Sequence, residues 1–504
     1  MARITIPYAV ADFVEMRERN FYYVDKTDFI PGLEDYKAPV FLRPRRFGKS
    51  LFISTLACYY DRTKADRFEE LFGGTWIGEY PTEEHNRYMI VRYDFSAMVM
   101  ADDMEGLERN FNRLNCSPVE IMVTHNRDVF KDFQFSSRDD ASQMLEEVLG
   151  YVREHGLPKV YILVDEYDNF TNQLLTAYKD PLYEQVTTRD SFLRTFFKVI
   201  KKGIGEGSVR TCFCAGVLPV TMDDLTSGYN IAEILTLHPR FLDMLGFTYE
   251  EASAYLGYVL KKYGTGQDSF EELWQLIVNN YDGYRFRPGA EPLFNSTILT
   301  YFFKNFATMD GMIPSELVDE NLRTDIGWIR RLTLSQENSK EMLDALVIDD
   351  ELSYNVSDLS SKFNKRKFFD KNFYPVSLFY LGMTTLRNNY RMVLPNLTMR
   401  SIYMDYYNEM NHIEGNAQRY VPTYERFTEE PFRTVGTKLL RAIPRAVPGA
   451  GVRQDQREFH PLLLLRALFP LPEQLLYVRH RAEQFGGPFG FRDDRYPRYG
   501  LLQG

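Results

Sequence analysis

The sequence predicts an α/β fold in which a parallel sheet lies between two layers of helices, a three-layer α/β/α core. The first observation is a set of short apolar runs with the length of buried strands, at residues 40–42, 88–96, 160–166 and 209–217. The second is the helical character of segments between and after them, at residues 50–56, 139–155 and 187–201. Strands that alternate with helices are typical of a parallel sheet, because each parallel connection needs a crossover.

A phosphate-binding loop is predicted between the first strand and the first of these helices. Gly48, Lys49 and Ser50 stand at its end. In such a loop, backbone N–H groups and the helix N-terminus face an anion, the lysine reaches the β- and γ-phosphates, and the serine hydroxyl is a ligand for Mg²⁺. The residues predicted to bind the cofactors, ATP and Mg²⁺, are Arg43, Arg45, Arg46, Phe47, Gly48, Lys49, Ser50 and Leu51.

Three arginines crowd this loop, and Arg43 stands where the motif G-x-x-x-x-G-K-[ST] has its first glycine. An arginine does not easily adopt a backbone conformation reserved for glycine, so we expect a changed loop shape and a weaker affinity. Arg43, Arg45 and Arg46 either clamp phosphates and stabilise transition-state charge, or pair with nearby acids and lie in solvent. Arg46 is the catalytic candidate among them.

The second half of the predicted site is the strand at residues 160–166, which ends in Asp165 and Glu166. Ligands of open α/β sheets bind at the carboxyl ends of strands, so both carboxylates are expected beside Lys49. In this Walker B role Asp165 holds Mg²⁺ together with Ser50, and Glu166 orients or deprotonates the attacking water. The alternative is a strand that simply ends at a solvated acidic turn.

Composition narrows the class of protein. The chain has 504 residues, enough for two to four domains, and a hydrophobic content of 44% that indicates globular packing.

No apolar stretch reaches the length of a membrane span and the N-terminus lacks the pattern of a signal peptide, so a cytoplasmic location is expected. Four cysteines and seven histidines form no disulfide framework or metal-binding pattern. The net charge of −10 argues against a wholly basic nucleic-acid binder.

Four regions are predicted along the chain: a P-loop domain at residues 1–245, a helical lid-like domain at 246–345, a winged-helix-like module at 346–430 and an atypical tail at 431–504. The helical region opens with Thr248 as N-cap and Glu251 at the capping-box position. Residues 203–207 lack the spacing of a dinucleotide motif and precede a strand, so a turn is predicted there. In related ATPases a polar residue at the end of the strand that starts at residue 209 senses the γ-phosphate. Here Thr211, Thr221 or neither has this role.

These motifs resemble the bacterial AAA-ATPase-like family found widely in gut bacteria, over roughly residues 1–425. The matching segments are residues 22–27, 41–51, 164–168, 246–248 and 281–286, of which the run Arg-Pro-Arg-Arg-Phe-Gly-Lys-Ser is the most specific. The resemblance implies a P-loop ATPase domain, usually followed by a PD-(D/E)XK nuclease domain. It also implies that Arg43 in place of glycine is a habit of the family. Ala215 departs from the threonine expected there.

The tail does not contain the sequence pattern expected of the nuclease domain that the resemblance implies. Residues 431–504 contain 12 Lys/Arg and six Asp/Glu, 11 of the 12 being arginine, and no Glu-x-Lys. A nuclease of this type needs that pattern to hold its metal and assist the water. The tail is therefore interpreted as a frameshift product near residues 430–440, with a linker or a basic nucleic-acid arm as the alternative.

The sequence favours a Mg²⁺-dependent P-loop ATPase, of the class with an added strand between the Walker motifs, that couples ATP binding or hydrolysis to conformational change. Lys49, Glu166 and Arg46 are the catalytic candidates. One alternative is a nucleotide-binding switch or scaffold with little hydrolysis. Another is an ATPase that engages nucleic acid through the winged-helix-like region. Partners beyond ATP, nucleic acid or protein, are not identified by the sequence, and neither is the oligomeric state.

Overall fold

The computed structural model describes residues 5–410, apart from 188–190, 226–227, 266–268 and most of 315–350. By its internal contacts the chain divides into two compact units, residues 1–402 and 403–504. The predicted tail at 431–504 lies outside the described residues, and so does the proposed frameshift. Among the helices that the structure describes, none has the length and apolar character that a bilayer span requires.

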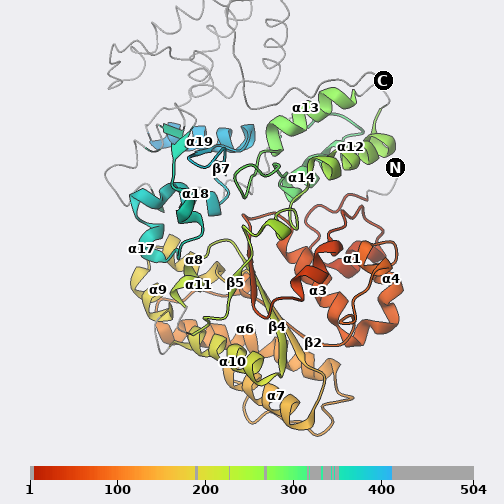
Figure 1. Ribbon diagram of the computed structural model, residues 1–504, viewed down its shortest axis with the longest axis vertical. Coiled ribbons are helices and arrows are strands. Elements are labelled where there is room, and N and C mark those ends of the chain that lie inside the picture. Colours follow the sequence, from red (N-terminus) through yellow and green to blue (C-terminus); the bar gives the residue numbers. More distant parts are fainter. Residues whose placement is uncertain are drawn as a thin grey trace, which may run out of the picture. The chain divides into compact units, whose positions relative to one another are not determined.

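A five-stranded parallel sheet forms the core of the first unit (Figure 1). Its strands stand in the order β2-β3-β4-β1-β5, so β4 is inserted between the strand before the phosphate loop and the strand with the two carboxylates. This order confirms the predicted class with an added strand. The strands are β1 (Pro39–Leu42), β2 (Met89–Asp94), β3 (Val160–Asp165), β4 (Val209–Gly216) and β5 (Glu233–Ile234).

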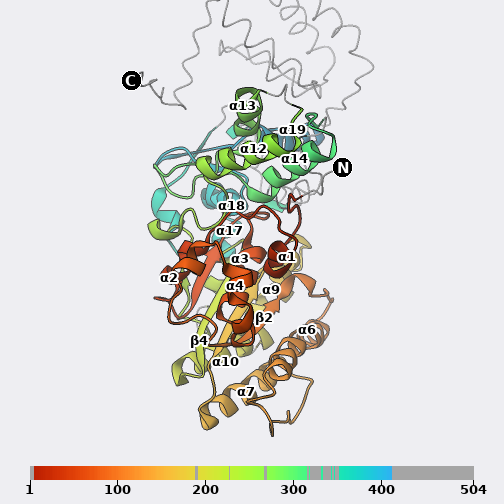
Figure 2. The same cartoon turned by 90° about the vertical axis from the view of Figure 1, so that its right-hand side faces the viewer.

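Helices cover both faces of the sheet, which confirms the three-layer prediction (Figures 1 and 2). On one face α3 (Lys49–Tyr60) packs across the central strands, with α1 (Phe13–Glu18) behind it. On the other face α6 (Met104–His125) and α10 (Phe192–Glu206) contact the sheet, and α7 (Ala141–His155) packs on both of them. The shorter helices are α2 (Ile30–Leu33), α4 (Phe68–Phe72), α5 (Trp76–Glu79), α8 (Asn169–Thr176), α9 (Asp180–Thr187) and α11 (Val220–Asp224).

One sequence prediction in this domain is wrong. Gly203 and Gly205 lie inside α10, which continues to Glu206, and only Gly207 turns the chain. Gly207 takes the left-handed conformation, with φ of 84°, that ends many helices and that glycine adopts at no steric cost. A glycine is required at position 203 of this helix, because a Cβ there would lie 2.7 Å from Leu149 of α7 and 2.8 Å from Val209 of β4.

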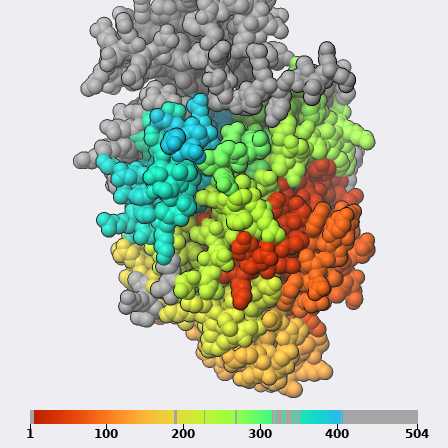
Figure 3. Space-filling model, viewed as in Figure 1, coloured from red at the N-terminus to blue at the C-terminus, as the bar shows by residue number. Residues whose placement is uncertain are grey.

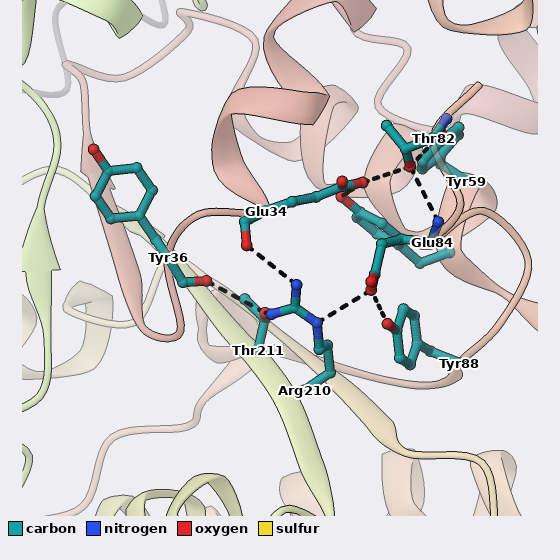
Figure 4. A network of polar contacts seen from close by, with 9 residues as sticks. Glu34, Tyr36, Tyr59, Thr82, Glu84, Tyr88, Arg210 and Thr211 are labelled. Carbon is teal, nitrogen blue, oxygen red and sulfur yellow. Dashed lines mark hydrogen bonds and ion pairs between the residues drawn. The ribbon is translucent and has the colours of Figure 1, made fainter. Parts of the chain in front are cut away.

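A polar network ties the start of β4 to two neighbouring loops, at the end of the sheet opposite the phosphate loop (Figure 4). The Arg210 guanidinium donates to the Glu34 carbonyl and forms an ion pair with Glu84, both at 3.1 Å. Thr82 donates to the Glu34 carboxylate at 2.7 Å. These contacts fix the chain that leads into β1, and hence the strand from which the phosphate loop starts.

The second half of the described chain is helical at first and then mixed. Three helices come first, α12 (Tyr249–Tyr263), α13 (Phe270–Tyr281) and α14 (Ser296–Thr308). Thr248 and Glu251 form the predicted capping box at the start of α12. A small antiparallel sheet of order β6-β8-β7 follows, made of β6 (Leu352–Ser353), β7 (Thr385–Leu386) and β8 (Arg391–Val393). The helices around it are α17 (Lys365–Phe368), α18 (Tyr374–Tyr380) and α19 (Leu397–Met410). The predicted four-region division and the winged-helix assignment stay predictions.

Candidate nucleotide-binding site

The loop between β1 and α3 has the shape of an anion-binding turn. Helix α3 begins at Lys49, and Gly48 before it takes a left-handed φ of 86°. Arg46 is also left-handed, with φ of 71°, whereas Arg43 has no positive φ. The glycine-like positions of this loop are therefore 46 and 48. Arg43 causes none of the backbone strain that the sequence led us to expect, because the loop does not need a glycine there.

Lys49 points back into its own loop. The side chain is only 5% exposed, and Nζ donates to the carbonyls of Arg43 and Pro44, both at 3.0 Å. Burial lowers the pKa of Lys49, while the carboxylates of Glu166 and Asp165 act in the opposite direction. An ammonium held at the centre of the loop in this way is placed to meet an anion that the loop amides surround.

Asp165 lies at the end of β3 and faces the first turn of α3. The Ser50 side chain lies beside the Asp165 carboxylate, and Arg92 of β2 approaches this carboxylate at 3.9 Å. Burial raises the pKa of Asp165, whereas the Ser50 hydroxyl and the Lys49 charge lower it. The structure thus brings together the two residues predicted to share a metal. Arg92 was not predicted, since one arginine in a strand carries no signal.

Glu166 follows in a left-handed conformation, with φ of 47°, and its amide donates to Asp165 Oδ1 at 3.0 Å. Burial raises the pKa of Glu166, and the nearby Lys49 charge opposes this rise. Left-handed backbone at a residue with a side chain is costly, and it recurs where a side chain has to be aimed. Here the turn aims Glu166 into the same pocket as Lys49 and Ser50.

This pocket runs from the phosphate loop to an apolar recess. Its polar end is formed by residues 46–51 and Glu166. Its apolar end is formed by the N-terminal segment, residues 244–247 and Tyr255 of α12, while Ser296, Thr297 and Thr300 of α14 add hydroxyl groups to the wall. In the space-filling view the red N-terminal part of the chain borders green parts from the middle of the sequence (Figure 3). The residues of this apolar end include Pro7, Val10, Met16, Tyr22, Tyr23, Val24, Met244, Leu245, Gly246, Phe247 and Tyr255.

Arg43 takes no part in this pocket through its side chain. The side chain is 1% exposed, and its guanidinium donates to the carbonyls of Thr236 at 3.0 Å and Leu242 at 2.8 Å. It also lies over the ring of Phe286, 3.7 Å from the centroid. Burial lowers the pKa of Arg43 to about 9. Among the three arginines this one is a packing element between β1 and the second half of the chain.

Asp168 joins the carboxylate turn to the end of β4. Its Oδ2 accepts from the Leu218 amide at 2.7 Å and from Asn172 Nδ2 at 2.7 Å, and both oxygens accept from the Val217 amide at 3.2 Å. Gly216 is required here, because a Cβ at that position would lie 2.4 Å from Asp168 Oδ1. Asp168 belongs to the sequence segment 164–168 that resembles the family, but no role was predicted for it.

Neither threonine proposed as a sensor lines the pocket. Thr211 lies near the start of β4, where its hydroxyl donates to the Tyr36 carbonyl. Thr221 is buried in α11 and shares a hydrogen bond of 2.6 Å with Thr171. The structure therefore favours the third alternative, that neither residue senses the phosphate.

The comparisons with known proteins agree with this geometry. A family model described as "Predicted AAA-ATPase" matches residues 7–226, which confirms the resemblance over that part of the chain. The match supports a general ATPase or nucleotide-binding role. A curated relative, described as "Uncharacterized protein in vnfD 5'region" of Azotobacter chroococcum mcd 1, is 29% identical over 258 residues. The aligned part covers 50% of this chain and 45% of that relative, so less than half of the relative's length is matched.

Proposed function

We propose that this chain, whose residues 7–226 match the predicted AAA-ATPase family, binds Mg²⁺ and ATP and hydrolyses the nucleotide. The observation that carries the proposal is the convergence of Lys49, Ser50, Asp165 and Glu166 at the carboxyl ends of β1 and β3. Lys49 and the amides at the start of α3 would bind the phosphates. Phosphoryl transfer depends on positioning and on charge stabilisation, and this set of groups would supply both.

The residues present fit a magnesium ion. Ser50 and Asp165 offer a hydroxyl and a carboxylate oxygen that lie close enough for Ser50 to lower the pKa of Asp165, so both are proposed to reach one ion. No cluster of three or more His, Cys, Asp or Glu side chains suited to a metal occurs in the part of the chain that the structure describes. Mg²⁺ commonly takes one or two protein ligands and completes its shell with phosphates and water. When bound it would neutralise charge on the phosphates.

Glu166 is the proposed proton acceptor. The raised pKa of its buried carboxyl makes the carboxylate a stronger base than one in water. The positive charge of Lys49 lowers the pKa of Glu166 and so favours the ionised form that accepts the proton. Arg46 lines the same pocket, and the Arg45 charge acts on both Lys49 and Glu166, so a contact with the phosphates remains proposed for both arginines.

The apolar end of the pocket is the proposed site of the base. The Tyr22 ring stacks on Tyr255 at 4.1 Å between centroids, and both residues line the recess with Gly246 and Phe247. A flat purine fits an apolar recess of this kind, whereas its phosphates extend toward Lys49. ATP is proposed, as the family match suggests.

The downstream modules are proposed to respond to the nucleotide. Helix α11 directly follows the end of β4 that Asp168 holds. Its Asp223 accepts from the Phe363 amide at 2.5 Å, and Asp224 accepts from the Lys365 amide at 3.2 Å. A movement of the β4 end would therefore reach α17. What the modules act on, nucleic acid or protein, stays unidentified.

The proposal is tested by Mg²⁺-dependent phosphate release from ATP. Lys49→Ala should lose both binding and turnover, a loss of about 2–4 kcal/mol in transition-state stabilisation. Glu166→Gln should keep ATP binding and lose turnover. The exposed Glu154 of α7 provides the matched control Glu154→Gln, which should behave as wild type. Wild-type protein that binds ATP without turnover would favour the switch, and absence of binding would refute the proposal.

A further inference from the structure

The first turn of α14, a helix about 250 residues further along the chain, holds the phosphate loop through hydrogen bonds. Asn295, the N-cap of this helix, donates from Nδ2 to the Arg45 carbonyl at 3.2 Å. The Thr297 amide donates to the Arg46 carbonyl at 3.0 Å, and the Ser296 hydroxyl approaches the same carbonyl at 3.4 Å. Two consecutive carbonyls of the loop are thereby tied to one helix end.

Tying these carbonyls sets the direction of the loop amides. A peptide unit is planar and trans, so its N–H points opposite to its C=O. The Arg45 carbonyl shares a peptide unit with the Arg46 amide, and the Arg46 carbonyl shares one with the Phe47 amide. With both carbonyls directed at the start of α14, the two amides are directed away from it. Asn295 does not line the pocket, so it orients these donors without touching the anion that they would bind.

Phe47 fixes the same loop by packing. Its side chain is buried against Tyr284 at 5.1 Å and Phe286 at 5.6 Å between ring centroids, both in edge-to-face geometry. On its third side stands Gly246, where a Cβ would lie 3.1 Å from the Phe47 ring. These contacts explain why the loop tolerates left-handed backbone at Arg46, a conformation that is unfavourable for a residue with a side chain.

We infer that Asn295 is a positioning residue for nucleotide binding, acting through the carbonyl of Arg45. The inference rests on the proposed function, because the positioned amides matter only if an anion binds there. Asn295 is 2% exposed, and it has two separate tasks: its Oδ1 caps α14 by accepting from the Ile298 amide, and its Nδ2 holds the loop. The second task links nucleotide binding to the position of α14, and by reciprocity the nucleotide stabilises this helix start.

The two tasks can be separated by substitution. Asn295→Ser keeps a good N-cap acceptor and removes the amide donor. Asn295→Asp keeps the size of the side chain and the cap but also lacks the donor, so it serves if the serine variant folds poorly. Asn364, the N-cap of α17, accepts from the Lys367 amide at 3.1 Å and has no hydrogen bond with the loop, so Asn364→Ser is the matched control.

The first measurement is the ATP dissociation constant in Mg²⁺, by calorimetry. Loss of one hydrogen bond that orders the loop should weaken binding about threefold to tenfold in Asn295→Ser, whereas Asn364→Ser should match wild type. A merely structural role would lower the melting temperature of Asn295→Ser without changing the dissociation constant, and that result would overturn the inference.

The second measurement is amide hydrogen exchange of residues 43–49 in the protein without nucleotide. Positioning predicts faster exchange of this loop in Asn295→Ser but not in Asn364→Ser. This readout needs no ATP, so it also decides the inference if wild-type protein binds no nucleotide and the proposed function fails. Unchanged loop exchange in Asn295→Ser and in Asn295→Asp would refute the positioning role.

Discussion

Replacing Arg43 with glycine restores the first glycine of the phosphate-loop motif, and the structure predicts that this change harms the protein. The motif alone would lead one to expect a loop of more usual shape and tighter binding. In the structure Arg43 has no positive φ, so the backbone gains nothing from glycine. The change would instead empty a buried space between Phe41 and Phe286, whose ring centroids lie 4.5 and 3.7 Å from the guanidinium carbon.

The expected loss of stability follows from the contacts. The guanidinium donates to three carbonyls, those of Leu42, Thr236 and Leu242, at 2.8–3.1 Å. Truncation of a large buried side chain typically costs about 3–5 kcal/mol. Burial of the charge itself is unfavourable, which offsets part of the hydrogen-bond gain. We therefore expect Arg43→Gly to lower the free energy of unfolding by about 4 kcal/mol, and Arg43→Met, which refills most of the space, by about half as much.

Urea unfolding followed by circular dichroism measures this loss, with ATP binding measured on the same samples below the transition. Arg87→Gly, at an exposed position of the loop before β2, is the control, and its unfolding midpoint should stay near that of wild type. If Arg43 were a phosphate ligand, Arg43→Gly would bind ATP far more weakly with an unchanged midpoint. That outcome, or a gain in stability, would refute the packing role.

Three further predictions concern residues outside the loop. Burial raises the pKa of Asp282 to about 6, so the folded chain retains a proton that the unfolded chain releases near pH 4. The contribution of Asp282 to stability should therefore fall by about 2 kcal/mol as the pH rises from 4 to 6, and Asp282→Asn should flatten this part of the stability curve in urea titrations at stepped pH. Asp168→Ala leaves the amides of Val217 and Leu218 without their acceptor, and thermal unfolding should show a loss of about 3 kcal/mol together with reduced ATP turnover. Wild-type stability in this variant would contradict the role given to Asp168. Thr248→Ala breaks the capping box of α12 and should lower the urea midpoint by an amount equivalent to about 1 kcal/mol, with Thr63→Ala on the surface as control.

Those parts of the site that depend on local sequence patterns could be predicted from the sequence alone. A strand, a loop and a helix around Gly48-Lys49-Ser50, and a buried strand ending in Asp165 and Glu166, fixed both the fold class and the convergence of the two motifs. These predictions rest on short-range rules, the burial of apolar strands and the common edge at which parallel strands end. The capping box at Thr248 was predictable for the same reason, since it spans only four residues.

Long-range contacts could not be predicted in this way. The burial of Arg43 depends on the carbonyls of residues 236 and 242 and on the ring of residue 286. No local sequence pattern predicts an arginine with such distant partners. Arg92 and Asn295 are likewise single polar residues whose roles arise only from the fold. The prediction of a turn at residues 203–207 was wrong for a related reason: Gly203 serves a close tertiary approach of α10 to α7 and β4, and no local pattern distinguishes such a glycine from one in a turn.

Aromatic residues of the motif at residues 281–286 connect the second half of the chain to the phosphate loop of the first half. Tyr284 and Phe286 pack on Phe47, and Phe286 also covers Arg43, so these aromatic residues serve the phosphate loop although they belong to the region predicted as a separate lid-like domain. Gly382, further along still, allows Pro44 of the loop to approach so closely that a Cβ would lie 2.5 Å from the proline Cβ. The loop is therefore enclosed by segments from three of the four predicted regions. A nucleotide that reshaped the loop would change contacts in all three, which is the physical basis for expecting the second half of the chain to respond to ATP.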